Sequence, residues 1–190
     1  MAANNQDDKS ILAAHAFVNR EADARIMSIH RSLLNIEGYA SELDFQPAPH
    51  ITLASWRVTP QELQLAETQF GDRLSGLSCT RLRAALKSRE HSEKRLHYYL
   101  LPEISESLRE FHAQMHRKLM WAFESYRRID LPGSWWPHLT LFSIPSTQEP
   151  HIEQALASLR EIEELSIERI GLVSYLGGAR VISDIELASA

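Results

Sequence analysis

Two segments of the sequence place a histidine two residues before a threonine. They read Pro49-His50-Ile51-Thr52-Leu53 and Pro137-His138-Leu139-Thr140-Leu141, and the two histidines are 88 positions apart (138 − 50). Imidazole titrates near neutral pH, so one histidine can accept a proton while a protonated partner donates one. A threonine hydroxyl can donate a hydrogen bond to a phosphate oxygen. Two such pairs facing each other would suit the cleavage of a phosphodiester without a metal ion.

The alternation of each segment predicts how a strand would present these groups. Residues i and i+2 of a β-strand project from one face, and residues i+1 and i+3 project from the other. Each segment is therefore expected to turn an imidazole and a hydroxyl to one side and to bury two aliphatic side chains on the other. Because each follows a predicted helix and a loop, we interpret the two segments as an internal duplication.

Hydrophobic periodicity along the chain predicts the element order β-α-β-α-β-β-α-β-α-β-β. The two ββ steps imply antiparallel pairing, which argues against a regular doubly wound parallel sheet. Residues 1–10 are expected to be a disordered tail and residues 11–187 one compact domain. Thr59 with Glu62, and Ser107 with Glu110, have the spacing of helix capping boxes. The second of these helices is expected to end near Tyr126.

Composition excludes several classes of protein. The chain has 190 residues, of which 44% are hydrophobic, and this argues against intrinsic disorder. It has one cysteine, so an internal disulfide is impossible. No apolar run approaches the roughly 18 residues of a membrane span. The formal net charge of −5 counts against a non-specific nucleic-acid-binding surface. We expect a cytoplasmic, monomeric protein with no membrane association.

The paired motifs, their separation and the flanking β-α-β pattern resemble the 2H phosphoesterase superfamily. Within it, the chain is most similar to the bacterial 2′-5′ RNA ligase / RNA 2′,3′-cyclic phosphodiesterase branch, over roughly residues 11–187. The resemblance implies a bilobal α+β fold, with two pseudo-symmetric antiparallel-rich sheets facing a central cleft and helices packed outside. It implies that His50 and His138 are catalytic and that Thr52 and Thr140 bind phosphate. It also implies an enzyme that needs no cofactor and no metal.

The expected substrates are RNA ends or small nucleotides that carry a 2′,3′-cyclic or 2′-5′ phosphodiester. Hydrolysis and ligation would use the same groups, and the spacing does not show which histidine is the acid and which the base. One alternative is a phosphodiesterase for 2′-5′ oligoadenylate or a small cyclic nucleotide. Another is a non-catalytic module that binds RNA ends. Two titratable imidazoles favour catalysis, because Arg or Lys would serve better for binding alone.

Three further features have weaker patterns. Six basic residues lie between Arg81 and Arg95 and could steer RNA, although a solvated hairpin also explains them. His112 and His116 have an i, i+4 spacing that can chelate zinc, but no third side-chain ligand lies at a suitable local spacing. Several aromatic residues near the predicted strands could stack a nucleobase or simply pack in the core. They are Trp56, Tyr98, Tyr99, Trp135, Trp136 and Tyr175.

Overall fold

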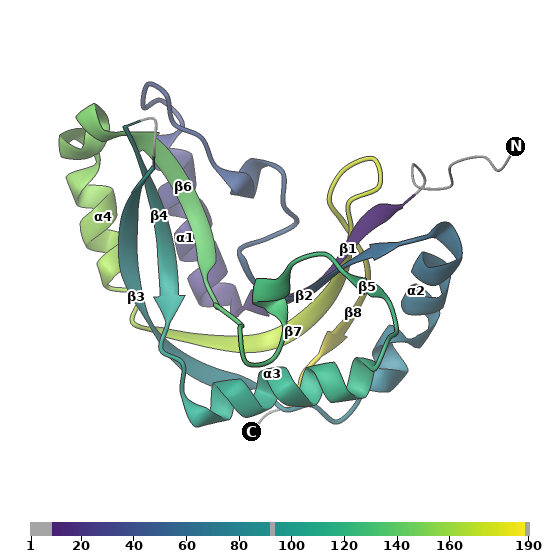
Figure 1. Ribbon diagram of the computed structural model, residues 1–190. Helices are drawn as coiled ribbons and strands as arrows, with labels where there is room; N and C mark the ends of the chain where they lie inside the picture. The colour runs from purple at the N-terminus through teal and green to yellow at the C-terminus, as the bar shows by residue number, and fades with distance from the viewer. Residues whose placement is uncertain (1–8, 92–93, 189–190) are drawn as a thin grey trace, which may run out of the picture.

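A computed structural model of the protein describes residues 9–91 and 94–188. The ribbon has the form of a U, with β3, β4, β6, α1 and α4 in one arm and β1, β2, β8 and α2 in the other (Figure 1). The α+β class and the two antiparallel-rich lobes expected from the sequence are confirmed. Residues 1–8 of the expected tail lie outside the described residues, and the first strand begins at Ser10.

The described strands pair only in the antiparallel sense. Their hydrogen-bonded order is β5-β2-β1-β7-β3-β4-β6, and β8 also pairs with β7. They are β1 (Ser10–Val18), β2 (His50–Val58), β3 (Thr80–His91), β4 (Arg95–Pro102), β5 (Glu124–Ser125), β6 (Leu139–Pro145), β7 (Glu164–Ser174) and β8 (Arg180–Glu186).

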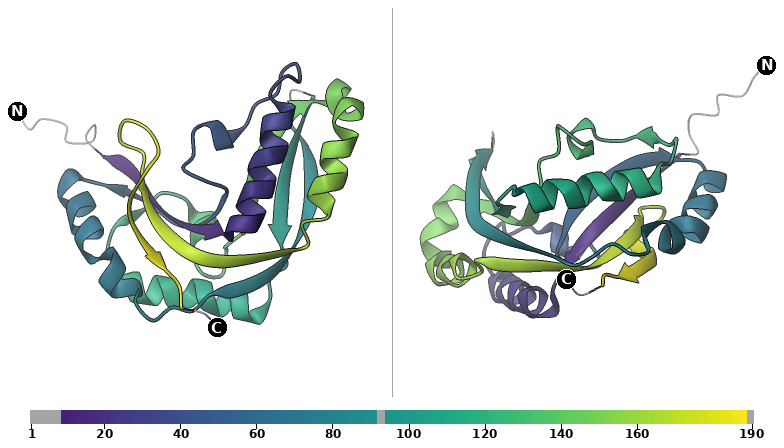
Figure 2. Two further views of the ribbon diagram at one scale, coloured as in Figure 1. Left: turned by 180° about the vertical axis from the view of Figure 1, so that it is seen from behind. Right: turned by 90° about the horizontal axis from the view of Figure 1, so that it is seen from below.

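Two long strands join the arms. Residues 80–83 of β3 pair with β7, and residues 84–91 of the same strand pair with β4. The edge of β7 is divided in the same way, since residues 164–167 pair with β3 and residues 169–174 pair with β8. Figures 1 and 2 show these two strands running along the base of the U. The two expected sheets are therefore two ends of one continuous sheet.

Four α-helices pack on the described strands. The helix pair α1 and α4 belongs to one arm, and α2 packs against both α3 and β8 (Figure 2). Within the described residues, no helix has the length and apolarity required to cross a membrane. The helices are α1 (Arg20–Leu33), α2 (Pro60–Leu74), α3 (Glu106–Leu119) and α4 (Glu153–Arg160), with 3₁₀ turns at Glu42–Asp44 (η1), Arg128–Asp130 (η2) and Ser146–Ile152 (η3).

Helix α3 differs from its prediction at both ends. Its N-cap is Ser105, whose hydroxyl accepts a hydrogen bond from the Leu108 amide, so the predicted cap at Ser107 is wrong. The helix ends at Leu119 because Met120 adopts the left-handed conformation with φ 41°. The next aromatic residue, Trp121, then packs against Trp56. The capping box of α2, from Thr59 to Glu62, is present as predicted.

Candidate active site

The two histidine motifs open the equivalent strands β2 and β6. His50 begins β2, and His138 immediately precedes β6. In both motifs the histidine and the threonine are half-buried, while the residues before, between and after them are buried. The predicted arrangement of Thr52 and Thr140 on the same face as their histidines therefore agrees with the burial pattern. We call this side of the two strands the motif face.

A β-bulge follows the threonine in each motif. Leu53 has no opposed residue on β1, and Leu141 has none on β4. A bulge bends its strand and leaves the extra residue outside the regular ladder. The duplication of the two halves therefore extends to the backbone register. The flanking Cα pairs are Ala14–Ala54 and His15–Thr52 in one case, and Tyr98–Phe142 and Tyr99–Thr140 in the other.

Both motif histidines are held through the same ring nitrogen. The Nδ1 atom of His50 lies 2.9 Å from the carbonyl oxygen of Ala48. The Nδ1 atom of His138 lies 3.0 Å from the carbonyl oxygen of Trp136. A carbonyl only accepts, so Nδ1 must carry the hydrogen, and Nε2 of a neutral ring is left with a lone pair. Nε2 is therefore the atom that each histidine can use for proton transfer.

His50 packs against a second histidine. Its ring stacks on the ring of His15, with centroids 3.6 Å apart and planes inclined by 6°. The pKa of His50 is lowered to about 4, mainly by burial and to a lesser extent by the nearby His138, while the hydrogen bond to the Ala48 carbonyl opposes the change. This coupling agrees with the close approach of β2 and β6, whose Cα atoms come within 8 Å. His50 is therefore neutral at pH 7 and suited to accept a proton.

The second motif histidine lies in an aromatic cluster that is open to solvent. The ring of Trp136 stacks on His138 with a centroid distance of 4.3 Å, and Trp136 is 40% exposed. Tyr99 meets both rings edge-on, at 5.6 Å from Trp136 and 6.5 Å from His138. Trp136 thus provides exposed aromatic surface next to a candidate catalytic group, and the half-buried Tyr99 packs beside it.

The other aromatic residues singled out from the sequence serve different roles. Trp56 and Tyr98 are buried in the core. Trp135 lies flat on His112 at 3.9 Å and donates its indole N–H to the carbonyl of Thr52. Tyr175 lies near His15. Of the six candidates, only Tyr99 and Trp136 contact His138.

Part of the basic stretch lies on the motif face. In the register of β3, β4 and β6, Lys87 is opposite Tyr99 and Tyr99 is opposite Thr140. Directly opposed residues share a face of the sheet, so Lys87 and, two positions on, Arg89 lie on the face of Thr140. Both side chains are exposed. Arg95 instead donates to the carbonyls of Gly38 and Ser143, which is a structural role.

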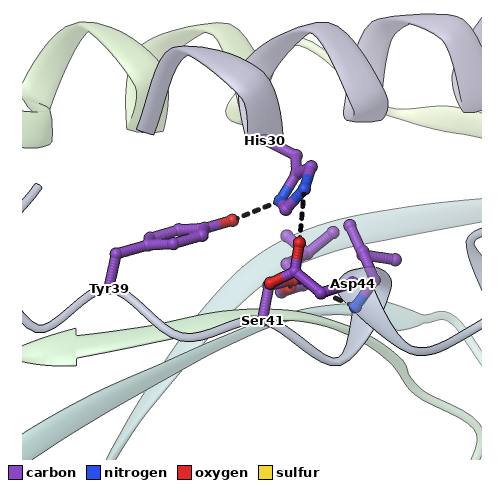
Figure 3. A network of polar contacts seen from close by, with 6 residues as sticks. His30, Tyr39, Ser41 and Asp44 are labelled. Carbon is purple, nitrogen blue, oxygen red and sulfur yellow. Dashed lines mark hydrogen bonds and ion pairs between the residues drawn. The ribbon is translucent and has the colours of Figure 1, made fainter. Parts of the chain in front are cut away.

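The segment that leads from α1 to the first motif is held by polar contacts to both α1 and the second motif strand. The Nδ1 atom of His30 on α1 lies 2.6 Å from the Tyr39 hydroxyl, and its Nε2 lies 3.2 Å from Asp44 Oδ1 (Figure 3). The Ser41 hydroxyl donates to the carbonyl of Leu141, the bulge residue of β6. The approach to His50 is therefore connected to the strand of His138.

Sequence reasoning gave no role to His15, although it is 1% exposed and lies directly on His50. Its Nε2 lies 3.3 Å from the Tyr175 hydroxyl, which donates to Gln46 at 3.0 Å. Burial lowers its pKa well below the ordinary value, so the ring is neutral. A single histidine in a strand has no pattern to reveal it. Only the pairing of β1 with β2 brings it to the site.

Comparisons with known proteins agree with this fold. No family model matches the chain, and neither does any curated protein. Among solved structures, TT0787 of Thermus thermophilus is 17% identical with a TM-score of 0.55, over 94% of this chain and 98% of that one. A phosphoesterase is 14% identical with a TM-score of 0.52, over 95% and 99% of the two chains. E. coli LigT complexed with 3′-AMP is 12% identical with a TM-score of 0.51, over 96% and 99%. The chain therefore shares its fold with these three proteins.

Proposed function

We propose that the protein is a phosphodiesterase that opens 2′,3′-cyclic phosphates at RNA ends by acid–base catalysis without a catalytic metal. The observation that carries the proposal is the matched pair of imidazoles, each holding Nδ1 on the carbonyl two residues earlier. Both rings thereby keep Nε2 for proton transfer, next to a threonine hydroxyl on the same face. E. coli LigT, which shares the fold, has been crystallised with 3′-AMP and with phosphate, which supports a nucleotide ligand.

The roles of the two histidines follow from their surroundings. His50 is neutral because burial lowers its pKa, and we assign it as the base. Its Nε2 takes a proton from water as the water oxygen forms a bond to phosphorus. The P–O3′ bond breaks on the opposite side, and Nε2–H of protonated His138 gives its proton to O3′. Thr52 and Thr140 donate hydrogen bonds to the non-bridging oxygens, and the product is a 2′-phosphate.

The same groups can also support ligation. If a 5′-hydroxyl replaces water, the step that opens the cyclic phosphate forms a 2′-5′ bond instead. The exposed Trp136, supported by the half-buried Tyr99, would stack the base next to the phosphate, and Lys87 would contact the RNA backbone. These features favour an RNA end over a small cyclic phosphate that lacks a base.

The test is incubation with a 2′,3′-cyclic mononucleotide and with a short RNA ending in a cyclic phosphate, both in EDTA. We expect conversion to the 2′-phosphate, with loss of at least about 100-fold in kcat for His50→Ala and for His138→Ala. The matched control is His151→Ala, an exposed histidine outside the motifs, which should keep full activity. Near-normal turnover in either motif variant would exclude the mechanism. A wild-type protein that binds these ends without turnover would favour the binding-module alternative.

A further inference from the structure

A second pair of histidines converges behind the motif strand. His112 and His116 of α3 approach one another with their Nε2 atoms 3.2 Å apart. The sequence spacing allows two ligands for a metal ion but supplies no third side chain. Among the described residues, no group of three or more His, Cys, Asp and Glu side chains could hold a metal ion. The remaining donors around this pair are main-chain oxygens, which a search of side chains does not find.

The carbonyl oxygens of Leu53 and Asp130 complete the cluster. The Leu53 oxygen lies 2.8 Å from His112 Nε2 and 3.2 Å from His116 Nε2. The Asp130 oxygen lies 3.1 Å from each of the two nitrogens. Each nitrogen is thus close to both oxygens, rather than to one oxygen each. The five distances that involve a nitrogen lie between 2.8 and 3.2 Å, and these values are compatible with a tetrahedron of donor atoms.

The positions of the ring hydrogens decide how these four atoms interact. If both Nε2 atoms carry hydrogens, His112 can donate to the Leu53 oxygen and His116 to the Asp130 oxygen. If one of them carries a hydrogen, the bare nitrogen lies against two carbonyl lone pairs at 3.1–3.2 Å. If neither does, four lone pairs converge. In that last arrangement the four atoms repel one another, and a cation at the centre would be the natural partner of all four.

We propose that His112 Nε2, His116 Nε2 and the carbonyl oxygens of Leu53 and Asp130 form a binding site for a divalent transition-metal ion such as Zn²⁺. A tetrahedron with edges of about 3.1 Å has its centre about 1.9 Å from each corner, close to the 2.0–2.1 Å of Zn–N bonds. Imidazole donors favour zinc over Mg²⁺ and Ca²⁺, which prefer more and harder oxygen ligands.

The surroundings of the cluster suit a bound cation. The Asp130 carboxyl group is buried and accepts a hydrogen bond from the Ser55 hydroxyl. It would supply negative charge close to the ion. Trp135 stacks on the His112 ring with planes inclined by 4°, which fixes the orientation of that ligand. A surface pocket of about 470 Å³, lined in part by His112, Arg109 and Trp135, offers a path of entry.

The location gives the ion a structural role. Leu53 is the bulge residue directly after Thr52, and Asp130 lies on the segment that leads to His138. An ion bound to both carbonyls and to α3 would therefore tie the backbones of the two motifs together. It would lie behind the motif strand, so EDTA should lower thermal stability without removing the proton-transfer groups.

The site is tested by titrating Zn²⁺ into chelator-treated protein in competition with a chromophoric chelator. We expect saturation at one equivalent, no displacement by excess Mg²⁺, and a rise in Tm of about 5–10 °C at Zn²⁺ about 100-fold above Kd. Each of His112→Gln and His116→Gln should weaken binding at least about 10-fold. His151→Gln should bind like the wild type, and so should the double variant His50→Gln/His138→Gln, which removes the other histidine pair.

Several outcomes would overturn the site. One is a wild-type protein with neither saturable binding nor a shift in Tm. Another is unchanged binding in His112→Gln and His116→Gln, or loss of binding only in the His50/His138 double variant. If the buried variant His112→Gln does not fold, the half-buried His116→Gln and the wild type still decide. Long-range ¹H–¹⁵N spectra of the wild type should then show Nδ1–H tautomers with Zn²⁺, whereas Nε2–H on both rings would refute the ligand assignment.

Discussion

His15 lies parallel to His50, with ring centroids 3.6 Å apart and planes inclined by 6°. One face of the candidate base is therefore covered by a neutral ring that is almost completely buried. The stack excludes water from that face, and burial is the main reason for the lowered pKa of His50. His15 is thus a positioning residue for the proposed reaction and a determinant of the proton affinity of His50.

Replacing His15 should therefore change a pH profile as well as a rate. His15→Ala admits water to the His50 ring, so the pKa of His50 should rise from about 4 toward 6.5. The acidic limb of kcat/KM should move to higher pH, with a loss of up to about 4-fold in rate at pH 6. His15→Phe keeps a flat ring in the stack and is the matched control. An acidic limb that stays in place in His15→Ala, with the protein folded, would refute this role.

The aromatic cluster leads to a prediction about binding. A stacked base contributes about 1–3 kcal/mol, so Trp136→Ala should raise KM for a cyclic nucleotide about 5- to 20-fold. The KM for ribose 2′,3′-cyclic phosphate, which has no base, should stay the same. Phe45→Ala removes another exposed aromatic ring and serves as the control. Equal effects of Trp136→Ala on the two substrates would mean that Trp136 supports His138 and does not bind the base.

Much of this site could be predicted because its chemistry repeats. The two motifs identified His50, Thr52, His138 and Thr140, and strand alternation placed each pair on one face. The bulges at Leu53 and Leu141 could not be predicted, since a bulge depends on pairing with a distant strand and on no residue type. The role of His15 depends on the same pairing.

The sharing of one sheet by both lobes also depends on tertiary contacts. Alternation predicts β3 as a strand but not that its two ends pair with different partners. The end of α3 was missed for a related reason. The apolar spacing of the helix continues to Ala122, but Met120 adopts the left-handed conformation and Trp121 packs against Trp56.

Two basic residues on the motif face should affect only longer substrates. Lys87→Gln and Arg89→Gln each remove one charge that could pair with a phosphate, so affinity for a short RNA should fall and its dependence on salt should weaken. Activity on a cyclic mononucleotide should not change. Arg117→Gln on α3 is the control, because Arg117 pairs with Glu110 on that helix. If the affinity for RNA has the same salt dependence in all three variants, Lys87 and Arg89 face solvent and do not contact the RNA.

Stability should fall as the pH decreases below about 6.5. His15 and His50 have lowered pKa values in the folded protein, so between about pH 5.0 and 6.5 the unfolded chain binds protons that the folded chain does not. Each such histidine contributes up to about 1.4 kcal/mol per pH unit to the free energy of unfolding. Urea unfolding at several pH values gives the free energy of unfolding as a function of pH. This free energy should depend less steeply on pH in His15→Phe than in the wild type, and equally steeply in His151→Ala. The same pH dependence of the free energy of unfolding in His15→Phe and the wild type would contradict this account.

The last prediction concerns the contact between the segment after α1 and the second bulge. The Ser41 hydroxyl is buried, accepts a hydrogen bond from the Leu43 amide and donates one to the Leu141 carbonyl. Ser41→Ala would leave a buried carbonyl of the motif strand without this donor. The free energy of unfolding should fall by about 1–3 kcal/mol.

The control is Ser32→Ala, since the Ser32 hydroxyl also donates to a carbonyl but lies exposed on α1. Its free energy of unfolding should change by less than about 0.5 kcal/mol. Because Leu141 directly follows Thr140, Ser41→Ala should also reduce kcat, whereas Ser32→Ala should not. If both variants lose the same stability, the bulge does not depend on Ser41. In that case the register of β4 and β6 alone must hold Thr140 beside His138.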